Sequence, residues 1–198
     1  MNSITQCIAQ IIFRGIYKIY YRLEIQGREN LEGTQKPMLI ISNHSSLNDP
    51  WVVGSSLPLW KYLPIRYMAA TKFYWPLNIA YKIGIIPFIY WLFGVISLPQ
   101  EGTFEDKIAP TVGALNHGDV VIIFPEGKRV FEDTVGEFRR GASEIYVRTR
   151  TIVVPIATRS HGRKMVLAIG KPFKPASALA EEVNKEMYEA VATLYASI

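Results

Sequence analysis

Short apolar runs alternate with amphipathic stretches along this chain. The runs have the length of buried strands, and they cover residues 38–42, 65–70, 119–124, 151–157 and 164–170. Helical periodicity between them predicts helices over about 50–59, 104–117, 138–149 and 176–197. This alternation predicts an α/β fold, with a single domain whose mostly parallel central sheet is covered by helices.

The N-terminal segment 4–22 is rich in apolar residues and has basic residues four apart at Arg14, Lys18 and Arg22. A helix would place these charges along one stripe, as in an amphipathic helix. Such a helix lies at a membrane interface or packs on the protein's own core, and its periodicity fits both. The tyrosines of this segment favour the interface: Tyr17, Tyr20 and Tyr21. No small-residue cleavage site follows the segment, so we expect it to be retained.

A second apolar stretch covers residues 73–99, in which Lys82 is the one charge. Gly84, Pro87 and Gly94 interrupt this stretch, so a straight spanning helix is not expected. We expect instead a helix, a membrane-associating piece and a short strand near 95–98.

The amino-acid composition indicates which class of binding partner to expect. The 198 residues include 22 Lys and Arg against 17 Asp and Glu, which gives a net charge of +5 and favours an anionic partner. The basic residues are interleaved with long apolar stretches and form no nucleic-acid motif, which favours a membrane over nucleic acid. The single cysteine, Cys7, has no partner for a disulfide or a structural zinc site, which predicts a reducing, cytosol-facing location.

Two polar clusters carry the candidate chemistry. The first has the sequence NHSSLND and follows the predicted strand 38–42. Its His44 and Asp49 lie on one loop that leads into a helix, so the carboxylate can orient the imidazole while the other ring nitrogen faces a substrate hydroxyl. The alternative is that His44 satisfies a turn and Asp49 only caps the helix.

The second cluster, FPEGKR, follows the clearest predicted strand. Pro125 and Gly127 favour a tight turn, from which Glu126 and the two cations, Lys128 and Arg129, would project into the crevice above the sheet. Arg129 can bind a phosphate or carboxylate through two hydrogen bonds, and Lys128 acts as a point charge. The alternative is a solvated polar turn.

Other kinds of site are not predicted. His117 and His161 have no ligand-like spacing to His44, so we expect no metal site. The sequence has no serine-hydrolase elbow, Walker-type phosphate loop or dinucleotide fingerprint.

In these clusters the chain resembles the glycerolipid acyltransferases of the PlsC type, the 1-acyl-sn-glycerol-3-phosphate acyltransferases. Their first motif is Asn-His-x4-Asp and their third is Phe-Pro-Glu-Gly-Thr-Arg-Ser. The resemblance implies that His44 and Asp49 are the catalytic pair. It also implies a substrate-binding turn that consists of Glu126, Gly127 and Arg129, to which Lys128 adds charge. Similar later segments, FRRG at 138–141 and VPI at 154–156, extend the resemblance over about 36–170.

The resemblance implies a membrane-associated O-acyltransferase that uses acyl-CoA or acyl carrier protein as donor, a lyso-lipid as acceptor and no bound cofactor. It implies a peripheral or monotopic location at the cytoplasmic face of the cell membrane. We expect residues 1–35 to form an interfacial helix and lead-in, and residues 36–198 to form the acyltransferase domain.

The sequence departs from the family's motifs in ways that bear on the acceptor. Lys128 and Val130 replace the threonine and serine of the third motif, and Gln100 stands where the second motif has an arginine. Acylation of 1-acylglycerol-3-phosphate to phosphatidic acid is the first expectation. Acyl transfer to another lyso-lipid, such as lyso-ornithine lipid, is the alternative. Further alternatives are an ester or thioester hydrolase and an inactive membrane-binding protein.

Overall fold

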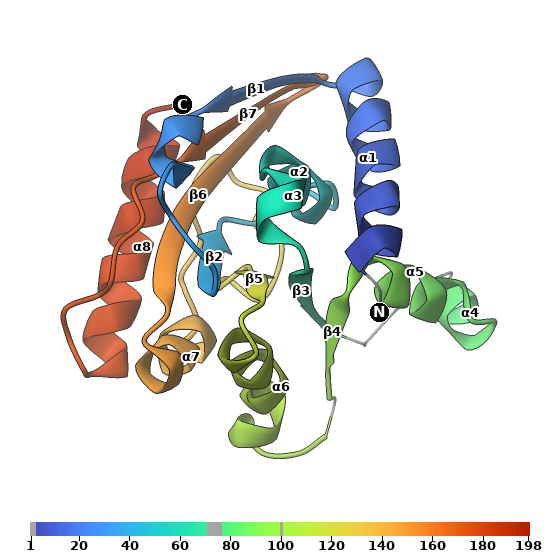
Figure 1. Ribbon diagram of the computed structural model, residues 1–198. Helices are drawn as coiled ribbons and strands as arrows, with labels where there is room; N and C mark the ends of the chain where they lie inside the picture. Colours follow the sequence, from blue (N-terminus) through green and yellow to red (C-terminus); the bar gives the residue numbers. More distant parts are fainter. Residues whose placement is uncertain (1–2, 71–76, 100) are drawn as a thin grey trace.

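The computed structural model describes residues 3–70, 77–99 and 101–198, and a twisted sheet in the order β1-β7-β6-β2-β5-β3-β4 lies at its centre (Figure 1). Neighbouring strands run parallel except for the antiparallel pair β6–β7. The strands are β1 (Arg22–Gln26), β2 (Met38–Ser42), β3 (Ile65–Ala70), β4 (Val95–Leu98), β5 (Val120–Ile123), β6 (Ile152–His161) and β7 (Lys164–Ile169). The fold is therefore the mostly parallel α/β sheet that the sequence predicts.

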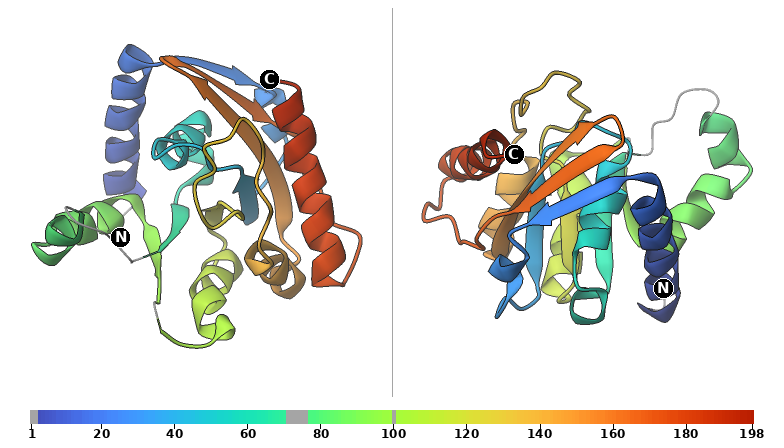
Figure 2. Two further views of the ribbon diagram at one scale, coloured as in Figure 1. Left: turned by 180° about the vertical axis from the view of Figure 1, so that it is seen from behind. Right: turned by 90° about the horizontal axis from the view of Figure 1, so that it is seen from above.

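Helices cover both faces of the sheet (Figures 1 and 2). One face carries α1 (Ser3–Tyr20), α2 (Asp49–Ser56), α3 (Leu59–Tyr62) and α5 (Ile85–Phe93), and the other carries α6 (Phe104–Asn116), α7 (Gly141–Thr149) and α8 (Ala180–Ala196). The remaining helical pieces are η1 (Arg28–Leu31) and α4 (Leu77–Lys82).

The central strand β2 is apolar at nearly every position because both of its faces are buried. Successive side chains point to opposite faces of a strand. Met38 and Ile40 therefore join the core under α1 and α2, whereas Leu39 and Ile41 join the core under α6, α7 and α8.

The N-terminal helix α1 packs on the protein through buried polar side chains. Gln6 donates to the carbonyls of Ile65 and Phe93, the latter at 2.7 Å, and accepts the Ile65 N–H at 3.1 Å. Gln10 donates to the Tyr67 hydroxyl at 2.6 Å. Buried polar groups need such partners, so these bonds fix which face of the helix turns inward.

The opposite face of α1 carries a row of exposed isoleucines, which are Ile4, Ile8, Ile11, Ile12, Ile16 and Ile19. The helix therefore packs on the protein along one face and presents an apolar row along the other. Tyr17 points inward and is buried, contrary to the expectation that it lies at a membrane surface, whereas Tyr20 is exposed.

The segment 73–99 forms α4, α5 and β4, as far as the structure describes it; its residues 73–76 lie outside the described ranges. Within those ranges no helix has both the length and the apolar character needed to cross a bilayer. The association of this segment with a membrane stays a prediction, as does the division of the chain at residues 35 and 36.

Several details differ from the sequence prediction. The segment expected as one helix over about 50–59 forms α2 and α3, and α8 begins at Ala180 and not near residue 176. The first helix ends at Tyr20, so Arg22 begins β1 and is not on the helical stripe of Arg14 and Lys18. Strand β1 was not predicted, because it is a short edge strand with alternating burial. Helix α7 starts at Gly141 because the backbone before it is held elsewhere: the Arg139 N–H donates to the Pro125 carbonyl at 2.8 Å.

We predict that Gly54→Ala lowers the free energy of unfolding by about 1–3 kcal/mol, the usual cost of overpacking a core. A methyl group at Gly54 would overlap the Tyr67 hydroxyl and disturb its bond from Gln10. Chemical denaturation measures the change. Gly113→Ala in α6 is the matched control, because a methyl group there meets nothing within 4 Å and should stabilise the helix by up to about 1 kcal/mol. Equal effects of the two substitutions would contradict the packing argument.

Candidate active site

The two polar clusters lie side by side because β2 and β5 are neighbouring parallel strands. Ile41 of β2 is in register with Ile123 of β5, so both clusters leave the sheet at the same edge. The Val130 N–H donates to the His44 carbonyl at 2.8 Å and joins the two loops directly. The loop between β5 and α7 lies at this edge, nearest the viewer in the left view of Figure 2. Ligands of open α/β sheets bind at such strand ends.

The imidazole of His44 is paired with a buried carboxylate. Its Nδ1 lies 3.1 Å from Oδ2 of Asp49, and the exposed side-chain fractions of the two residues are 18% and 0%. The same oxygen accepts the backbone N–H groups of Ser45 and Ser46, each at 2.7 Å. Asp49 thus holds the loop and the ring together. A carboxylate at Nδ1 favours the proton on that nitrogen, which leaves Nε2 as the proton acceptor.

Asp49 is not the cap of helix α2. Asn48 occupies the N-cap position, and Asp49 is the first helical residue, followed by Pro50 in the first turn. The Asp49 carboxylate turns back to the preceding loop, where it accepts its hydrogen bonds. The interpretation of Asp49 as a simple helix cap is therefore wrong.

The ring of His44 also packs against Phe124, the first residue of the second cluster. The two ring centroids are 4.5 Å apart and the planes are inclined by 32°. This contact and the bond to Asp49 restrict the imidazole on two sides. Through Phe124, the second cluster thus helps to orient the imidazole of His44.

Glu126 is buried and joins three parts of the site. One carboxylate oxygen accepts the His44 N–H at 3.1 Å, and the other accepts the Gly136 N–H at 2.9 Å. Burial raises the pKa of the Glu126 carboxyl, and the hydrogen bonds from Gly136 and His44 oppose this rise. Both oxygens are engaged with the protein's own backbone, so Glu126 holds the loops in position.

The turn after Glu126 leaves its cations exposed. Gly127 has a φ of +66°, and its N–H donates to the Phe124 carbonyl at 3.1 Å. A methyl group at this position would come within 2.9 Å of the Arg139 side chain, so the glycine allows that side chain to lie over the turn. Lys128 and Arg129 are exposed, and the Arg129 guanidinium lies 5.3 Å from the centroid of the Phe131 ring.

Two asparagines of the first cluster have roles that the sequence did not reveal. The side chain of Asn43 donates to the Thr158 carbonyl at 2.9 Å and accepts the Thr158 N–H at 2.8 Å, which anchors the loop to β6. Asn48 accepts from the Tyr17 hydroxyl and donates to the Tyr21 hydroxyl, both at 2.8 Å. The loop of His44 is therefore tied to the N-terminal helix and to the residue that follows it.

Tyr17 is a stable donor in this bridge. Burial first, then the neighbouring Tyr21 and the charge of Asp49, raise the pKa of Tyr17 to about 12. Its hydroxyl therefore stays protonated over the whole physiological range.

Gln100 lies outside the described residues. Arg140 stacks its guanidinium 4.7 Å from the ring centroid of Phe104, at the start of α6. Among the described residues, no group of His, Cys, Asp or Glu side chains could hold a metal ion.

Comparison with known proteins is consistent across sequence and structure. A family model described as Acyltransferase matches residues 22–159. The chain is 29% identical over 153 residues to the chloroplastic 1-acyl-sn-glycerol-3-phosphate acyltransferase LPAT1 of Arabidopsis thaliana, covering 74% of this chain and 38% of that protein. It is 31% identical over 137 residues to a 1-acyl-sn-glycerol-3-phosphate acyltransferase of Pseudomonas aeruginosa, covering 69% of this chain and 49% of that protein. The chain thus spans less than half the length of these relatives.

The crystal structure of the 1-acyl-sn-glycerophosphate acyltransferase PlsC from Thermotoga maritima has the same fold. Its TM-score is 0.71 at 19% sequence identity, over 98% of this chain and 81% of that chain.

We predict that Glu126→Gln lowers the free energy of unfolding by about 1–3 kcal/mol, the cost of an unsatisfied buried donor. An amide has one acceptor oxygen, so either the His44 or the Gly136 N–H would face an NH₂ group. Urea denaturation measures the loss. The control is Glu137→Gln, which makes the same chemical change at an exposed position of the same loop. An unchanged stability of Glu126→Gln would show that the two hydrogen bonds do not hold the loops.

Proposed function

The chain belongs to the acyltransferase family, and we propose that it transfers a fatty acyl group from a thioester donor to the free hydroxyl of a lyso-glycerophospholipid. The first acceptor to test is 1-acylglycerol-3-phosphate, with phosphatidic acid as product. The observation that carries the proposal is the 3.1 Å contact between His44 Nδ1 and the buried Asp49 carboxylate, in a loop hydrogen-bonded to the FPEGKR turn.

In the proposed reaction Nε2 of His44 takes the proton of the acceptor hydroxyl. The oxygen attacks the thioester carbonyl and forms the new C–O bond. Asp49 stabilises the imidazolium that results. The C–S bond then breaks, and the thiolate of the donor leaves and takes the proton from His44. The donor is acyl-CoA or acyl carrier protein in this proposal, and no acyl-enzyme forms.

The acceptor's phosphate would bind at the exposed cations of the turn. Lys128 and Arg129 follow the buried Glu126 after Gly127, and the next N–H, that of Val130, bonds to the His44 carbonyl. A phosphate bound there would lie beside the loop that carries the imidazole. Arg129 can offer it two parallel N–H donors. Glu126 would act by holding this turn and the His44 loop in register.

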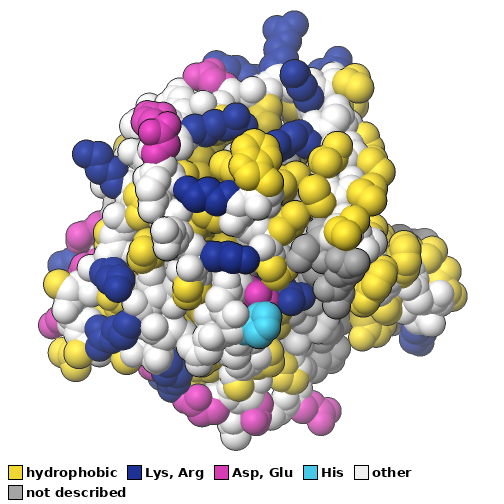
Figure 3. All heavy atoms as spheres, viewed as in Figure 1, with side chains coloured by type: hydrophobic (Ala, Val, Ile, Leu, Met, Phe, Trp, Pro, Cys, Tyr) yellow, Lys and Arg dark blue, Asp and Glu magenta, His cyan; other side chains and the backbone are white. Residues whose placement is uncertain are grey.

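The exposed apolar surface supports action at a bilayer. Hydrophobic side chains gather over α1 and over α4 and α5 along one edge of the face shown in Figure 3. The exposed ones on α4, α5 and the link between them include Ile79, Ile83, Ile85, Phe88 and Trp91. Two more lie in the site loops, where Leu47 is 63% and Phe131 is 79% exposed. We propose that these surfaces dock the protein peripherally on the cytoplasmic face of the membrane that holds the lipid acceptor.

A second acceptor class follows from the second motif, in which Gln100 replaces the family's arginine. A lyso-lipid without a terminal phosphate, such as lyso-ornithine lipid, would not need that charge. Mass spectrometry of the products formed from a panel of lyso-lipids distinguishes the two classes. Free fatty acid released without any acceptor would instead indicate a hydrolase.

We predict that His44→Ala lowers kcat by about 10²–10⁴-fold, the usual contribution of a general base. Binding to vesicles should be unchanged, because the substitution leaves the apolar surface intact. The control is His117→Ala, which removes an exposed imidazole at the end of α6, before β5 begins. Undiminished turnover by the His44 variant would refute the assignment of the base.

We predict that Arg129→Ala raises the KM for the acceptor, with a smaller change in kcat. A charge that holds substrate and transition state alike contributes uniform binding. Initial rates at varied acceptor concentration measure the change, and Arg129→Lys should recover part of it. An acceptor KM equal to that of the unmodified protein would place Arg129 outside the substrate site.

A further inference from the structure

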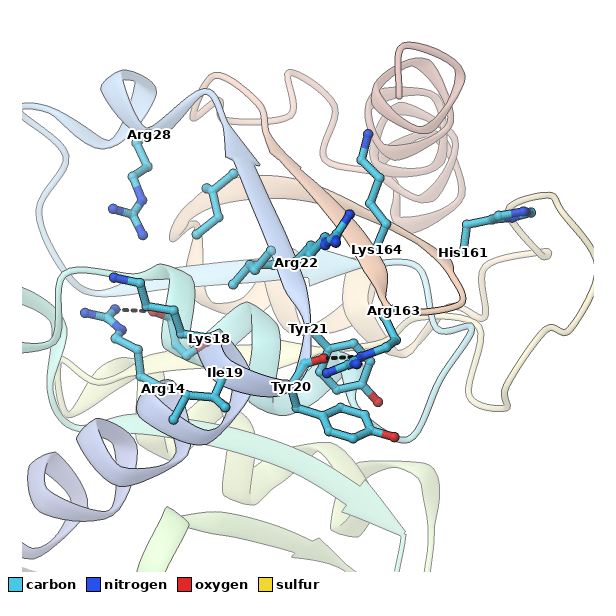
Figure 4. A pocket seen from close by; sticks show the side chains of 13 residues that line it. Arg14, Lys18, Ile19, Tyr20, Tyr21, Arg22, Arg28, His161, Arg163 and Lys164 are labelled. Carbon is cyan, nitrogen blue, oxygen red and sulfur yellow. Dashed lines mark hydrogen bonds between the residues drawn. The ribbon is translucent and has the colours of Figure 1, made fainter.

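A basic groove of about 900 Å³ lies between the C-terminal half of α1, strand β1 and the β6–β7 hairpin (Figure 4). Its basic side chains come from four separate parts of the chain. They are Arg14, Lys18, Arg22, Arg28, His161, Arg163 and Lys164. Among the described residues that line the groove, none is acidic.

Part of this charge is fixed by contacts with the backbone. Arg14 donates to the carbonyl of Ser55 and, at 2.8 Å, to that of Leu57, at the end of α2. Arg163 donates to the Tyr20 carbonyl at 2.9 Å, and its guanidinium lies 5.0 Å from the centroid of the Tyr20 ring. These two guanidinium groups are therefore held in place beside the groove without loss of their charge.

Most of the remaining Lys and Arg charge has no acidic partner among the described residues. Lys164 has a carboxylate partner, since Glu24 lies 3.4 Å away. Within the described part of the chain, no ion pair or side-chain hydrogen bond holds Lys18, Arg22 or Arg28. Burial and the nearby charge of Arg28 lower the pKa of Arg14, as expected where like charges face one another. An anion bound in the groove would relieve this repulsion.

Apolar side chains lie beside these cations. Ile19 is 85% and Tyr20 is 57% exposed, and both line the groove. They continue the isoleucine row on the outer face of α1. A helix with an apolar row beside a cluster of Lys and Arg is typical of surfaces that bind anionic lipids at the membrane interface.

We infer that this groove binds the phosphate of an anionic phospholipid head group, at a site separate from the one where acyl transfer is proposed. The cations would contact the phosphate while Ile19 and the outer row of α1 meet the acyl region. The phosphates of coenzyme A offer similar chemistry, but they would not use the exposed apolar side chains beside the groove. The observations therefore favour the lipid.

The groove is connected to the proposed active site through Tyr21. Tyr21 lines the groove, and its hydroxyl accepts a hydrogen bond from Asn48 at 2.8 Å. Asn48 precedes Asp49 and occupies the N-cap position of α2. A head group in the groove would therefore place the His44 loop at a fixed position relative to the lipid surface.

The test compares a variant of the groove with a matched variant elsewhere. The groove variant combines Lys18→Gln, Arg22→Gln and Arg28→Gln. The control combines Lys171→Gln, Lys174→Gln and Lys185→Gln, which remove three exposed charges at and before α8, on the far side of the sheet from α1 (Figure 1). Both are made in the His44→Ala background, so that the result does not depend on acyl transfer. Circular dichroism confirms folding, and Lys18→Gln alone is the reserve variant.

Binding is measured by sedimentation with vesicles of phosphatidylcholine, with and without phosphatidylglycerol. A charge near the surface contributes roughly fivefold to affinity, so the groove variant should lose on the order of 100-fold on anionic vesicles and Lys18→Gln about fivefold. The affinity of the control variant for anionic vesicles should fall much less. Binding to pure phosphatidylcholine vesicles should be equal for all variants. Equal losses in the groove variant and the control would overturn the inference.

Two soluble competitors distinguish the source of the phosphate. Neither inorganic phosphate nor coenzyme A should displace the protein from anionic vesicles at matched ionic strength, if the lipid's apolar part adds to binding. Displacement by coenzyme A that is lost in the groove variant would assign the groove to the acyl donor. Displacement by inorganic phosphate would make it a simple anion site. Either result would overturn the lipid assignment, and neither depends on whether His44 is the catalytic base.

Discussion

The buried carboxylate of Glu126 is the interaction on which the candidate site depends. It accepts one N–H from the His44 loop and another from Gly136, so one side chain fixes three stretches of backbone. A carboxylate in this position is costly to bury, as its raised pKa reflects, and the two backbone donors partly offset the loss of water. The neighbouring ends of β2 and β5 bring the loops together, and Glu126 helps to hold them there through its bond from the His44 N–H.

The N-terminal helix α1 packs on the protein with one face and exposes the opposite face to the surroundings. Gln6, Gln10 and Tyr17 bind the protein, and the isoleucines opposite them remain exposed. Many of the exposed large hydrophobic side chains lie on α1, α4 and α5, and Tyr17 links the first of these helices to the loop that carries His44. The helix with the exposed isoleucine row and the candidate site are therefore joined by hydrogen bonds.

The sequence predicted most of the sheet, because strands buried on both faces are apolar throughout. The runs at 38–42 and 65–70 match β2 and β3, and the short strand near 95–98 matches β4. Edge strand β1 escaped prediction because half of it faces solvent. Polar contacts between residues far apart in the sequence were not predicted, for another reason. Nothing in the local pattern relates Tyr17 to Asn48, and the engagement of Glu126 with backbone depends on a fold that only the whole chain specifies.

Asn43 immediately precedes His44, and its contacts restrict which residue types this position can hold. The last rung of the ladder between β2 and β6 pairs Ser42 with Ile156, and the carboxamide of Asn43 then binds both backbone groups of Thr158. The side chain thus imitates a peptide group, while its own main chain turns away toward His44. A carboxylate could not donate to the carbonyl, and a longer amide would not fit the same spacing. Asparagine is the residue that lets the strand end without leaving buried peptide groups unpaired.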